Sequence, residues 1–455
     1  LSNTTGADNA AFGNGALYAN TTASNNTAFG SQALLSNTTG TQNVAVGFAA
    51  LDAVTTSSYN TAVGYNALTA NTAEDNTAVG RAALSSNTTG TDNTSVGKGS
   101  LAQNTTASYN TAVGTEALGL NTTGHSNTAV GYLALDSNTT ANDNTALGRE
   151  ALQANTTGAS NTAVGWSALY ANTTAANNTS VGYNSMVANT TGTQNVAVGT
   201  NALDANTTAS YNTALGYNAL GANTTGAENV AIGVQALTAC TTTDANVAIG
   251  ASAQTQSTTS EKCVSIGYLA GYQITTGDNN ISIGTDAART GSPGGAVTTA
   301  SNQICLGDEN ITHAFIQVDF AAQSDKRDKT DVEPLNTGLS FINKLEPVTF
   351  RWDKRGKYID ETDTSVDLTK VVPDGTHKED WLDLGFLAQD VEELEEEYGY
   401  KRENKTNLLT NLSNDGTSYS LKYSRFVPSL VKAVQELSAE VEELKAQPKC
   451  KCQGD

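Results

Sequence analysis

Short apolar and polar segments alternate along residues 1–290 with a fixed period. A glycine that closes a Thr-Ala-Val-like triplet recurs every 17 residues, with a single interval of 16. One unit begins at Asn110 and reads NTAVGTEALGLNTT, followed by a turn-rich stretch. Seventeen residues are too few for a helical hairpin, and Asn, Thr and Gly are poor helix formers. The period therefore predicts one coil of a parallel β-solenoid per unit.

The parity of each triplet predicts an inside and an outside. Ala112 and Gly114 share one face of a strand and Val113 lies on the other, so small residues fill the coil and a row of Val, Phe, Leu and Ile faces outward. Coils spaced about 4.8 Å apart would build a rod roughly 80 Å long. An exposed apolar row of this length indicates an interaction surface. Identical chains around a common axis would bury it, so the row predicts a parallel homotrimer.

The asparagine that begins each unit, such as Asn110, Asn127 and Asn161, is expected to stack on its equivalents as a side-chain amide ladder. Two functional alternatives exist for the polar residues. Regular threonine rows could match an ice lattice, and Asn-Thr-Thr fits the glycosylation sequon. Structural turns and ladders are the favoured interpretation.

Composition changes abruptly at Ser324. Charged residues number 23 before this serine and 46 from it onward. We therefore expect solenoid repeats over 1–290, a linker and strand over 291–323, and a separate domain over 324–455. The linker contains a Gly-Ser-Pro-Gly-Gly turn and an alternating apolar segment, 314–320, that predicts a strand running toward Ser324.

Bulk composition narrows the possible partners. The sequence pI is about 4.4 and no basic stripe occurs, so nucleic acid is not expected as a partner. No apolar run approaches the roughly 20 residues that span a bilayer, so no membrane insertion is expected. Neither a metal nor a cofactor is expected, because the five cysteines are sparse and Cys450 and Cys452 lack further ligands. The chain begins in mid-repeat at Leu1, which suggests a fragment or a processed product.

The C-terminal segment has a helical pattern. Apolar residues recur at heptad spacing and predict a coiled-coil helix over about 424–446, although packing of this helix on its own domain is an equally open alternative. These residues are Val427, Leu430, Val434, Leu437, Val441 and Leu444. The acidic run Glu392–Glu397 predicts a solvated helix face, and Trp352 and Trp381 are expected in the core.

Ser324 and Lys329 are candidate catalytic residues. A lysine that is desolvated can accept the proton of a serine hydroxyl, so these two residue types suffice for a Ser-Lys dyad. Serine five residues before lysine is common in itself, so this hypothesis depends on its surroundings. Here the pattern Ser-Asp-x-Arg-x-Lys stands at a sharp domain boundary.

Both parts of the chain resemble known families. The 17-residue unit resembles the YadA-like head repeat of trimeric adhesins and the Asn-Thr-rich repeats of phage tail fibres, although its units are longer and carry a second Ala-Leu segment. Residues 324–445 resemble the C-terminal intramolecular chaperone domain of phage endosialidases and tail fibres, found also in a membrane-bound transcription factor family of animals. The segments that carry this second resemblance are the dyad motif, LEPVTFRW at 345–352, GFLAQDV at 385–391 and YSRFVPSLVKA at 423–433.

The resemblance implies that the domain trimerises, drives folding of the repeats, and releases itself by autoproteolysis at the Gln323–Ser324 bond. It makes Ser324 the nucleophile and Lys329 the general base. Asp325, Arg327, Gly385 and Gln389 would be motif or orienting residues. Some relatives carry a histidine just before the Gly-Phe-x-Ala-Gln motif, a position that this chain fills with Asp and Leu, so a histidine-assisted step is not expected.

The expected fold is thus mostly β, with a trimeric solenoid rod, a small α+β chaperone domain and a coiled-coil helix. The expected function is a phage tail fibre or appendage of the virion that attaches to a host receptor or glycan. Its enzymatic activity would be one turnover of serine endopeptidase chemistry on its own backbone. Two alternatives are a bacterial surface adhesin stalk, located on the cell surface, and a solenoid ice-binding protein.

Overall fold

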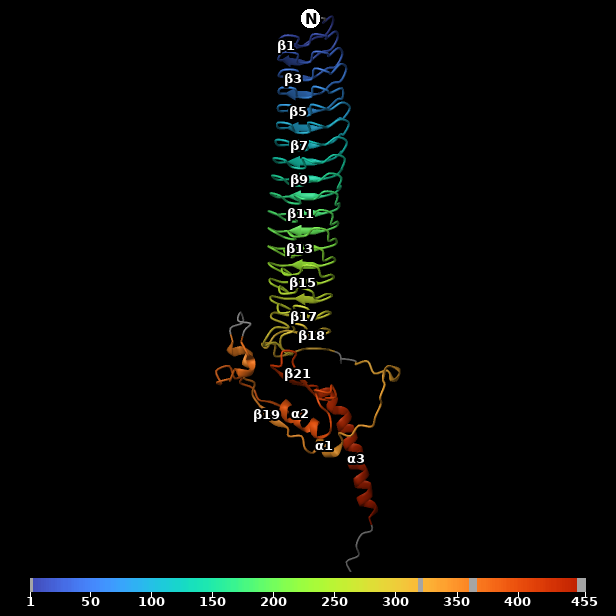
Figure 1. Cartoon of the computed structure of the whole chain (residues 1–455), viewed down its shortest axis with the longest axis vertical. Coiled ribbons are helices and arrows are strands. Elements are labelled where there is room, and N and C mark those ends of the chain that lie inside the picture. Colours follow the sequence, from blue (N-terminus) through green and yellow to red (C-terminus); the bar gives the residue numbers. More distant parts are fainter. Residues whose placement is uncertain (1–2, 318–321, 360–365, 448–455) are drawn as a thin grey trace, which may run out of the picture. The chain divides into compact units, whose positions relative to one another are not determined.

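The structure is a computed structural model that describes residues 3–317, 322–359 and 366–447. The chain divides into two compact units. The first holds Leu1–Ile281 with Ser301–Gln303, and the second holds Ser282–Ala300 with Ile304–Asp455. Figure 1 shows the first unit as a regular stack of coils and the second as a mixture of helices, short strands and loops.

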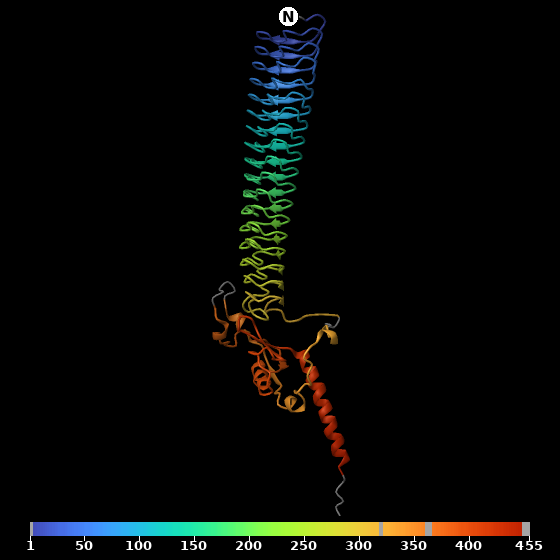
Figure 2. The same ribbon diagram turned by 45° about the vertical axis from the view of Figure 1, so that its right-hand side comes forward.

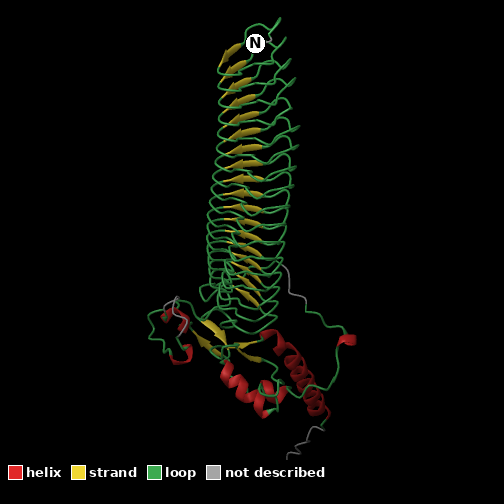
Figure 3. Ribbon diagram, turned by 45° about the horizontal axis from the view of Figure 1, so that its top comes forward, coloured by secondary structure: helices red, strands yellow, loops and turns green. Residues whose placement is uncertain are grey.

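Each coil of the first unit contributes one strand of three residues, and these strands form a single row (Figure 3). They are β1 (Ala10–Phe12), β2 (Thr27–Phe29), β3 (Val44–Val46), β4 (Thr61–Val63), β5 (Thr77–Val79), β6 (Thr94–Val96), β7 (Thr111–Val113), β8 (Thr128–Val130), β9 (Thr145–Leu147), β10 (Thr162–Val164), β11 (Thr179–Val181), β12 (Val196–Val198), β13 (Thr213–Leu215), β14 (Val230–Ile232), β15 (Val247–Ile249) and β16 (Val264–Ile266). The chain passes between the two units at β17 (Ile281–Ile283) and β18 (Ile304–Leu306).

Neighbouring strands pair in parallel and in register. Thr111 of β7 lies opposite Thr128 of β8, one period of 17 residues away. The single shorter period pairs Thr61 with Thr77 without disturbing this register. Its missing residue falls in the turn before Asn76, where the coil is free to shorten. The stack therefore tolerates a deletion outside the strand.

Alternation along each strand separates core from surface. In β7 the middle residue, Ala112, is fully buried, while Val113 is 36% exposed. Farther along the same coil Leu118 is fully buried, and the columns of Ala and Leu together form the core of the stack. The predicted outward row is present, and its first members, Phe12 and Phe29, are 69% and 54% exposed with stacked rings.

In most coils three residues other than glycine adopt positive φ. In one coil they are Glu116, Leu118 and Ser126, with φ of 58°, 51° and 58°. Branching at Cβ makes this region highly unfavourable, and the equivalent columns hold no Val, Ile or Thr among the positive-φ residues of the coils. The alternation of left- and right-handed residues folds the stretch after each strand into a tight series of turns.

Two asparagine ladders satisfy the backbone of these turns. Asn127 donates from its backbone N to Asn110 Oδ1 at 3.0 Å and from Nδ2 to the Ala141 carbonyl at 2.9 Å, as the sequence predicted. A second ladder was not predicted. In it Asn138 Nδ2 donates to Asn121 Oδ1 at 2.8 Å and to the same Ala141 carbonyl at 3.0 Å. Each buried amide is therefore bonded both within its own coil and to the next.

The second unit is mixed. Its elements are η1 (Lys326–Asp328), α1 (Leu339–Ile342), β19 (Val348–Phe350), η2 (Arg355–Tyr358), η3 (Leu368–Lys370), β20 (Asp383–Gly385), α2 (Ala388–Glu397), β21 (Thr410–Leu412), β22 (Tyr419–Leu421), η4 (Tyr423–Arg425) and α3 (Phe426–Ala446). Two antiparallel pairs, β19 with β20 and β21 with β22, are its sheets. Its core contains Phe341, Val391, Leu394, Leu409 and Phe426. The predicted fold class, a mostly β solenoid followed by a small region with short sheets and a C-terminal helix, is confirmed.

Helix α3 has two different faces. Phe426, Ser429 and Ala433 are buried, and Ser429 Oγ lies 2.8 Å from Thr337 Oγ1. All six heptad residues lie outside this contact and are 38–65% exposed. In Figure 2 the C-terminal half of α3 extends away from the rest of its unit. The helix thus packs on its own domain through one face and leaves the heptad face uncovered.

Three smaller expectations were wrong. The strand expected over 314–320 does not form over 314–317, because no described strand pairs with that segment, and 318–320 lie outside the described residues. Trp352 and Trp381 are 46% and 52% exposed rather than in the core, because both line a pocket. Within the acidic run, Glu395 is only 1% exposed.

The burial of Glu395 has a clear cause. Its Oε1 accepts hydrogen bonds from the backbone N of Leu408 at 2.7 Å and of Leu409 at 2.6 Å, and its Oε2 accepts from Thr410 N at 3.1 Å and Thr410 Oγ1 at 2.5 Å. A carboxylate that caps three backbone N–H groups recovers much of the hydration lost on burial. Glu395 therefore fixes the start of β21 against α2.

Candidate functional site

A short 3-10 helix shapes the segment around the predicted cleavage bond. Asp325 is the N-cap of η1, and its Oδ1 accepts a hydrogen bond from Arg327 N at 2.9 Å. At the other end Lys329 N donates to the Lys326 carbonyl at 3.3 Å. Asp is among the best N-cap residues because its side chain satisfies an otherwise free N–H group. One helical turn consequently folds Lys329 back toward Ser324.

The two predicted catalytic side chains meet. Lys329 Nζ donates a hydrogen bond to Ser324 Oγ over 2.6 Å. This distance is within the range that proton transfer between a nucleophile and its base requires. Both residues are exposed, so the described part of this chain does not supply the desolvation that a neutral lysine amine needs.

Charged neighbours hold this turn in place. Arg327 Nε lies 3.1 Å from both carboxylate oxygens of Asp325, and Arg327 Nη2 lies 2.5 Å from Oδ2. The hydrogen bonds from the Arg327 side chain hold the pKa of Asp325 below its usual value. On the other side of the bond, Gln323 Nε2 donates to Asp328 Oδ2 at 3.1 Å. The residues on both sides of Gln323–Ser324 are thus tied to η1.

The remaining motif residues lie in another part of the second unit. Gly385 ends β20 opposite Val348 of β19, and a Cβ at this glycine would overlap the hydroxyl oxygen of Tyr423. That hydroxyl accepts a hydrogen bond from Phe386 N at 3.3 Å. Gln389 is exposed in the first turn of α2. None of the hydrogen bonds recorded for 322–359 and 366–447 joins Gly385 or Gln389 to the Ser324–Lys329 pair.

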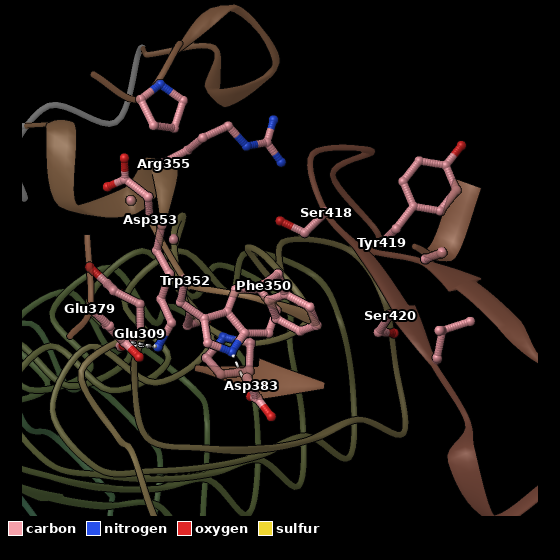
Figure 4. A pocket seen from close by; sticks show the side chains of 18 of the residues that line it. Glu309, Phe350, Trp352, Asp353, Arg355, Glu379, Asp383, Ser418, Tyr419 and Ser420 are labelled. Atoms are coloured by element: carbon pink, nitrogen blue, oxygen red, sulfur yellow. Dashed lines mark hydrogen bonds and ion pairs between the residues drawn. The ribbon is translucent and has the colours of Figure 1, made fainter. Parts of the chain in front are cut away.

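Gln389 and the residues that follow Gly385 border a pocket of about 860 Å³. Figure 4 shows Phe350, Trp352 and Asp383 in its lining. Trp352 Nε1 donates to Asp383 Oδ2 at 3.2 Å, and the Phe350 ring lies edge-on to Trp352. Neither Ser324 nor Lys329 lines the pocket. In the described segments no group of three or more His, Cys, Asp or Glu side chains could hold a metal ion.

Comparison with known proteins gives one family match. Residues 324–400 match the family described as the chaperone of endosialidase. The C-terminal part of the chain is therefore similar to this family over the matched residues. No curated protein and no solved structure gave a significant match.

The family match starts at Ser324, the residue that the resemblance predicts as the nucleophile. The chaperone-of-endosialidase domain therefore begins immediately after the predicted scissile bond. Among the described helices none is long and apolar enough to cross a membrane. What sequence reasoning missed in this domain is the buried Glu395, whose backbone partners lie 13 to 15 residues away along the chain.

Proposed function

We propose that this chain is a trimeric tail-fibre or appendage protein of a virion, in which the C-terminal domain assembles the solenoid and then cuts itself off at Gln323–Ser324. The observation that carries the proposal is the 2.6 Å contact between Lys329 Nζ and Ser324 Oγ at the first residue of the chaperone domain. Attachment to a host surface is the role of the assembled rod.

The proposed cleavage uses these two side chains in turn. Neutral Lys329 takes the proton of Ser324 Oγ, and the oxygen attacks the carbonyl carbon of Gln323 on its own N-terminal side. The peptide C–N bond breaks, the proton passes to the Ser324 nitrogen, and an ester links Gln323 to Ser324 Oγ. Water then hydrolyses the ester and leaves a Gln323 carboxylate and a free Ser324 amine.

Assembly of the chains would supply the desolvation of Lys329 that a single chain lacks. Lys329 and Ser324 are exposed in one chain, whereas burial of Lys329 against a second chain would favour its neutral form. Cleavage would then occur only after the three chains have met. This order protects the chaperone function, because the domain is released when it has already done its work.

Two uncovered apolar surfaces support the trimer. The outward Val, Phe, Leu and Ile row runs through every coil of the first unit, and the heptad face of α3 is 38–65% exposed. Heptad residues on an exposed helix face are typical of coiled-coil association. Association of three α3 helices would bring the chains together at their C-terminal ends.

The test is expression of residues 1–455 beside Ser324→Ala and Lys329→Ala, with Lys326→Ala as a control that removes a nearby exposed lysine. We expect wild type and Lys326→Ala to split into two fragments on a denaturing gel, and the smaller to begin at Ser324 by N-terminal sequencing. Both dyad variants should stay whole and still have the mass of a trimer in solution. Intact wild-type trimers would refute the peptidase, and monomers would refute the assembly role.

A further inference from the structure

The residue that follows the ladder glycine of each coil forms a second outward row, which we call the post-glycine row. It contains three of the four Lys and Arg residues found in residues 1–284, namely Arg81, Lys98 and Arg149. It also contains seven aromatic residues that are each 44–55% exposed. These are Phe48, Tyr65, Tyr132, Trp166, Tyr183, Tyr217 and Tyr268.

Four consecutive coils carry the densest part of this row. Arg149 Cζ lies 5.8 Å from the ring centroid of Tyr132 and 5.1 Å from that of Trp166, so the guanidinium lies between two rings. The Trp166 and Tyr183 centroids are 5.5 Å apart at a nearly right angle. Cation–π contacts orient an arginine that would otherwise be mobile at the surface. We call Tyr132, Arg149, Trp166 and Tyr183 the aromatic–arginine ladder.

We propose that the aromatic–arginine ladder binds an extended neutral glycan lying along the rod. Arg149 occupies the faces of Tyr132 and Trp166 that it lies over, so the half-exposed outer edges of these rings, which carry partial positive charge, would contact the sugar and its hydroxyl oxygens. Successive rungs lie about 4.8 Å apart because they follow the parallel strands, a step similar to one sugar unit. A polysaccharide could therefore place consecutive rings over consecutive coils.

The charges at the ladder favour a neutral chain over an acidic one. Arg149 is paired with Glu150, whose Oε1 lies 3.1 Å from Nε and 2.9 Å from Nη2. The pair is neutral overall and offers both donors and acceptors to sugar hydroxyls. The chain as a whole has a formal net charge of −21, which repels anionic polymers.

A second copy of the chain is a poorer occupant of this surface. Chains related by a common axis and repeating every coil need a similar contact at each coil, which the Val-type row provides. The post-glycine row changes instead from coil to coil, with Thr115 before the ladder and Thr200 after it. A half-exposed Trp166 in a unit made mostly of small residues marks a local site, because exposed aromatic clusters are typical of binding surfaces.

This inference names the class of ligand for the proposed host-attachment role, and it rests on that role. The experiment measures binding of the full chain to cellohexaose and chitohexaose, two neutral probes, and to hexagalacturonate, an acidic one, by calorimetry. Trp166→Ala and Arg149→Ala test the ladder. Tyr211→Ala is the matched control, because Tyr211 is 57% exposed but lies in a different row.

We expect at least one neutral hexasaccharide to bind, with a dissociation constant at least tenfold higher for Trp166→Ala and unchanged for Tyr211→Ala. Binding of none of the probes, preference for the acidic probe, or equal losses in all three variants would overturn the proposal. So would loss of the trimer in Trp166→Ala, which would assign the ladder to contacts between copies. A trimer that cleaves itself and binds no glycan would refute this inference alone, whereas a glycan-binding monomer would refute the assembly role alone.

Discussion

Replacement of Gly97 by alanine should damage the solenoid far more than its small change in volume suggests. Gly97 has a φ of +140°, and an added Cβ would overlap the carbonyl oxygen of Gly114 in the next coil. Forcing an L-residue into this region costs about 1–3 kcal/mol. Overpacking against a backbone that cannot move independently adds about 1–3 kcal/mol. We expect a loss of about 2–6 kcal/mol per chain.

The same coil contains a matched control. Gly99 has a φ of +67°, and a Cβ there would lie 3.4 Å from Glu116 Cγ, an ordinary contact. Asn66 and Asn184 occupy the same column with φ of 55° and 52°. Gly99→Asn should therefore change the free energy of unfolding by no more than about 1 kcal/mol. Any gain would arise because asparagine makes the unfolded chain less flexible than glycine does.

The assay is the unfolding rate of the full chain in guanidinium, followed by far-ultraviolet circular dichroism, because rods of this kind unfold too slowly for equilibrium. A loss of 2 kcal/mol that appears in the unfolding rate corresponds to about a 30-fold acceleration. Gly97→Ala should reach at least this value. A Gly97→Ala chain that unfolds within threefold of wild type, or a Gly99→Asn chain that unfolds as fast as Gly97→Ala, would refute the close-approach argument.

Three further changes test other parts of the structure. Asn155→Ala removes a buried amide that donates to Asn138 and Gly158 and accepts from Asn172, so three hydrogen bonds are lost and calorimetry should show a loss of about 3–5 kcal/mol. Burial, and then the charge of Glu116, raise the pKa of Asp136 to about 6. Between about pH 4 and 6 the folded chain therefore keeps a proton on Asp136 that the unfolded chain loses. The free energy of unfolding should fall by roughly 1 kcal/mol over this range after solvent screening. In Asp136→Asn the melting temperature should lack this dependence on pH. Leu437→Asp places a charge on the exposed heptad face, so light scattering should show monomers with unchanged helical content, and a persistent trimer would exclude the coiled coil.

The solenoid could be predicted from the sequence because its constraints repeat. Small residues at Ala112 and Gly114 and a branched residue at Val113 fix the inside and the outside of a strand, and the period fixes the coil. The positive-φ columns were not predicted, although a signal for them exists. The columns of Glu116, Leu118 and Ser126 lack residues branched at Cβ in coil after coil. Such an absence is visible only when the units are aligned.

The second unit shows where sequence patterns are insufficient. The run 392–397 contains five glutamates and one leucine. Nothing in this pattern distinguishes the glutamate that is buried, Glu395, from the four that are not. Its partners are backbone N–H groups near Thr410, which only the tertiary fold brings close. Trp352 likewise depends on tertiary context, because the same ring can fill a core or line a pocket. The Ser324–Lys329 contact was predictable, since an Asp N-cap and one 3-10 turn lie between the two residues.

The regularity that makes the solenoid predictable also creates the need for a separate assembly domain. If three chains pack through the outward row, a slip of one coil still places Val113 of one chain beside an equivalent Val, Leu or Phe of another. Only the contacts of the terminal coil are lost, so correct and slipped trimers differ little in free energy. The heptad face of α3 does not share the 17-residue period and holds only six apolar residues, so a slip by one heptad would lose a large share of its contacts. Joining the chains there before the coils stack would remove the slipped alternatives, and the proposed cleavage at Gln323–Ser324 would then leave a rod that could not return to them.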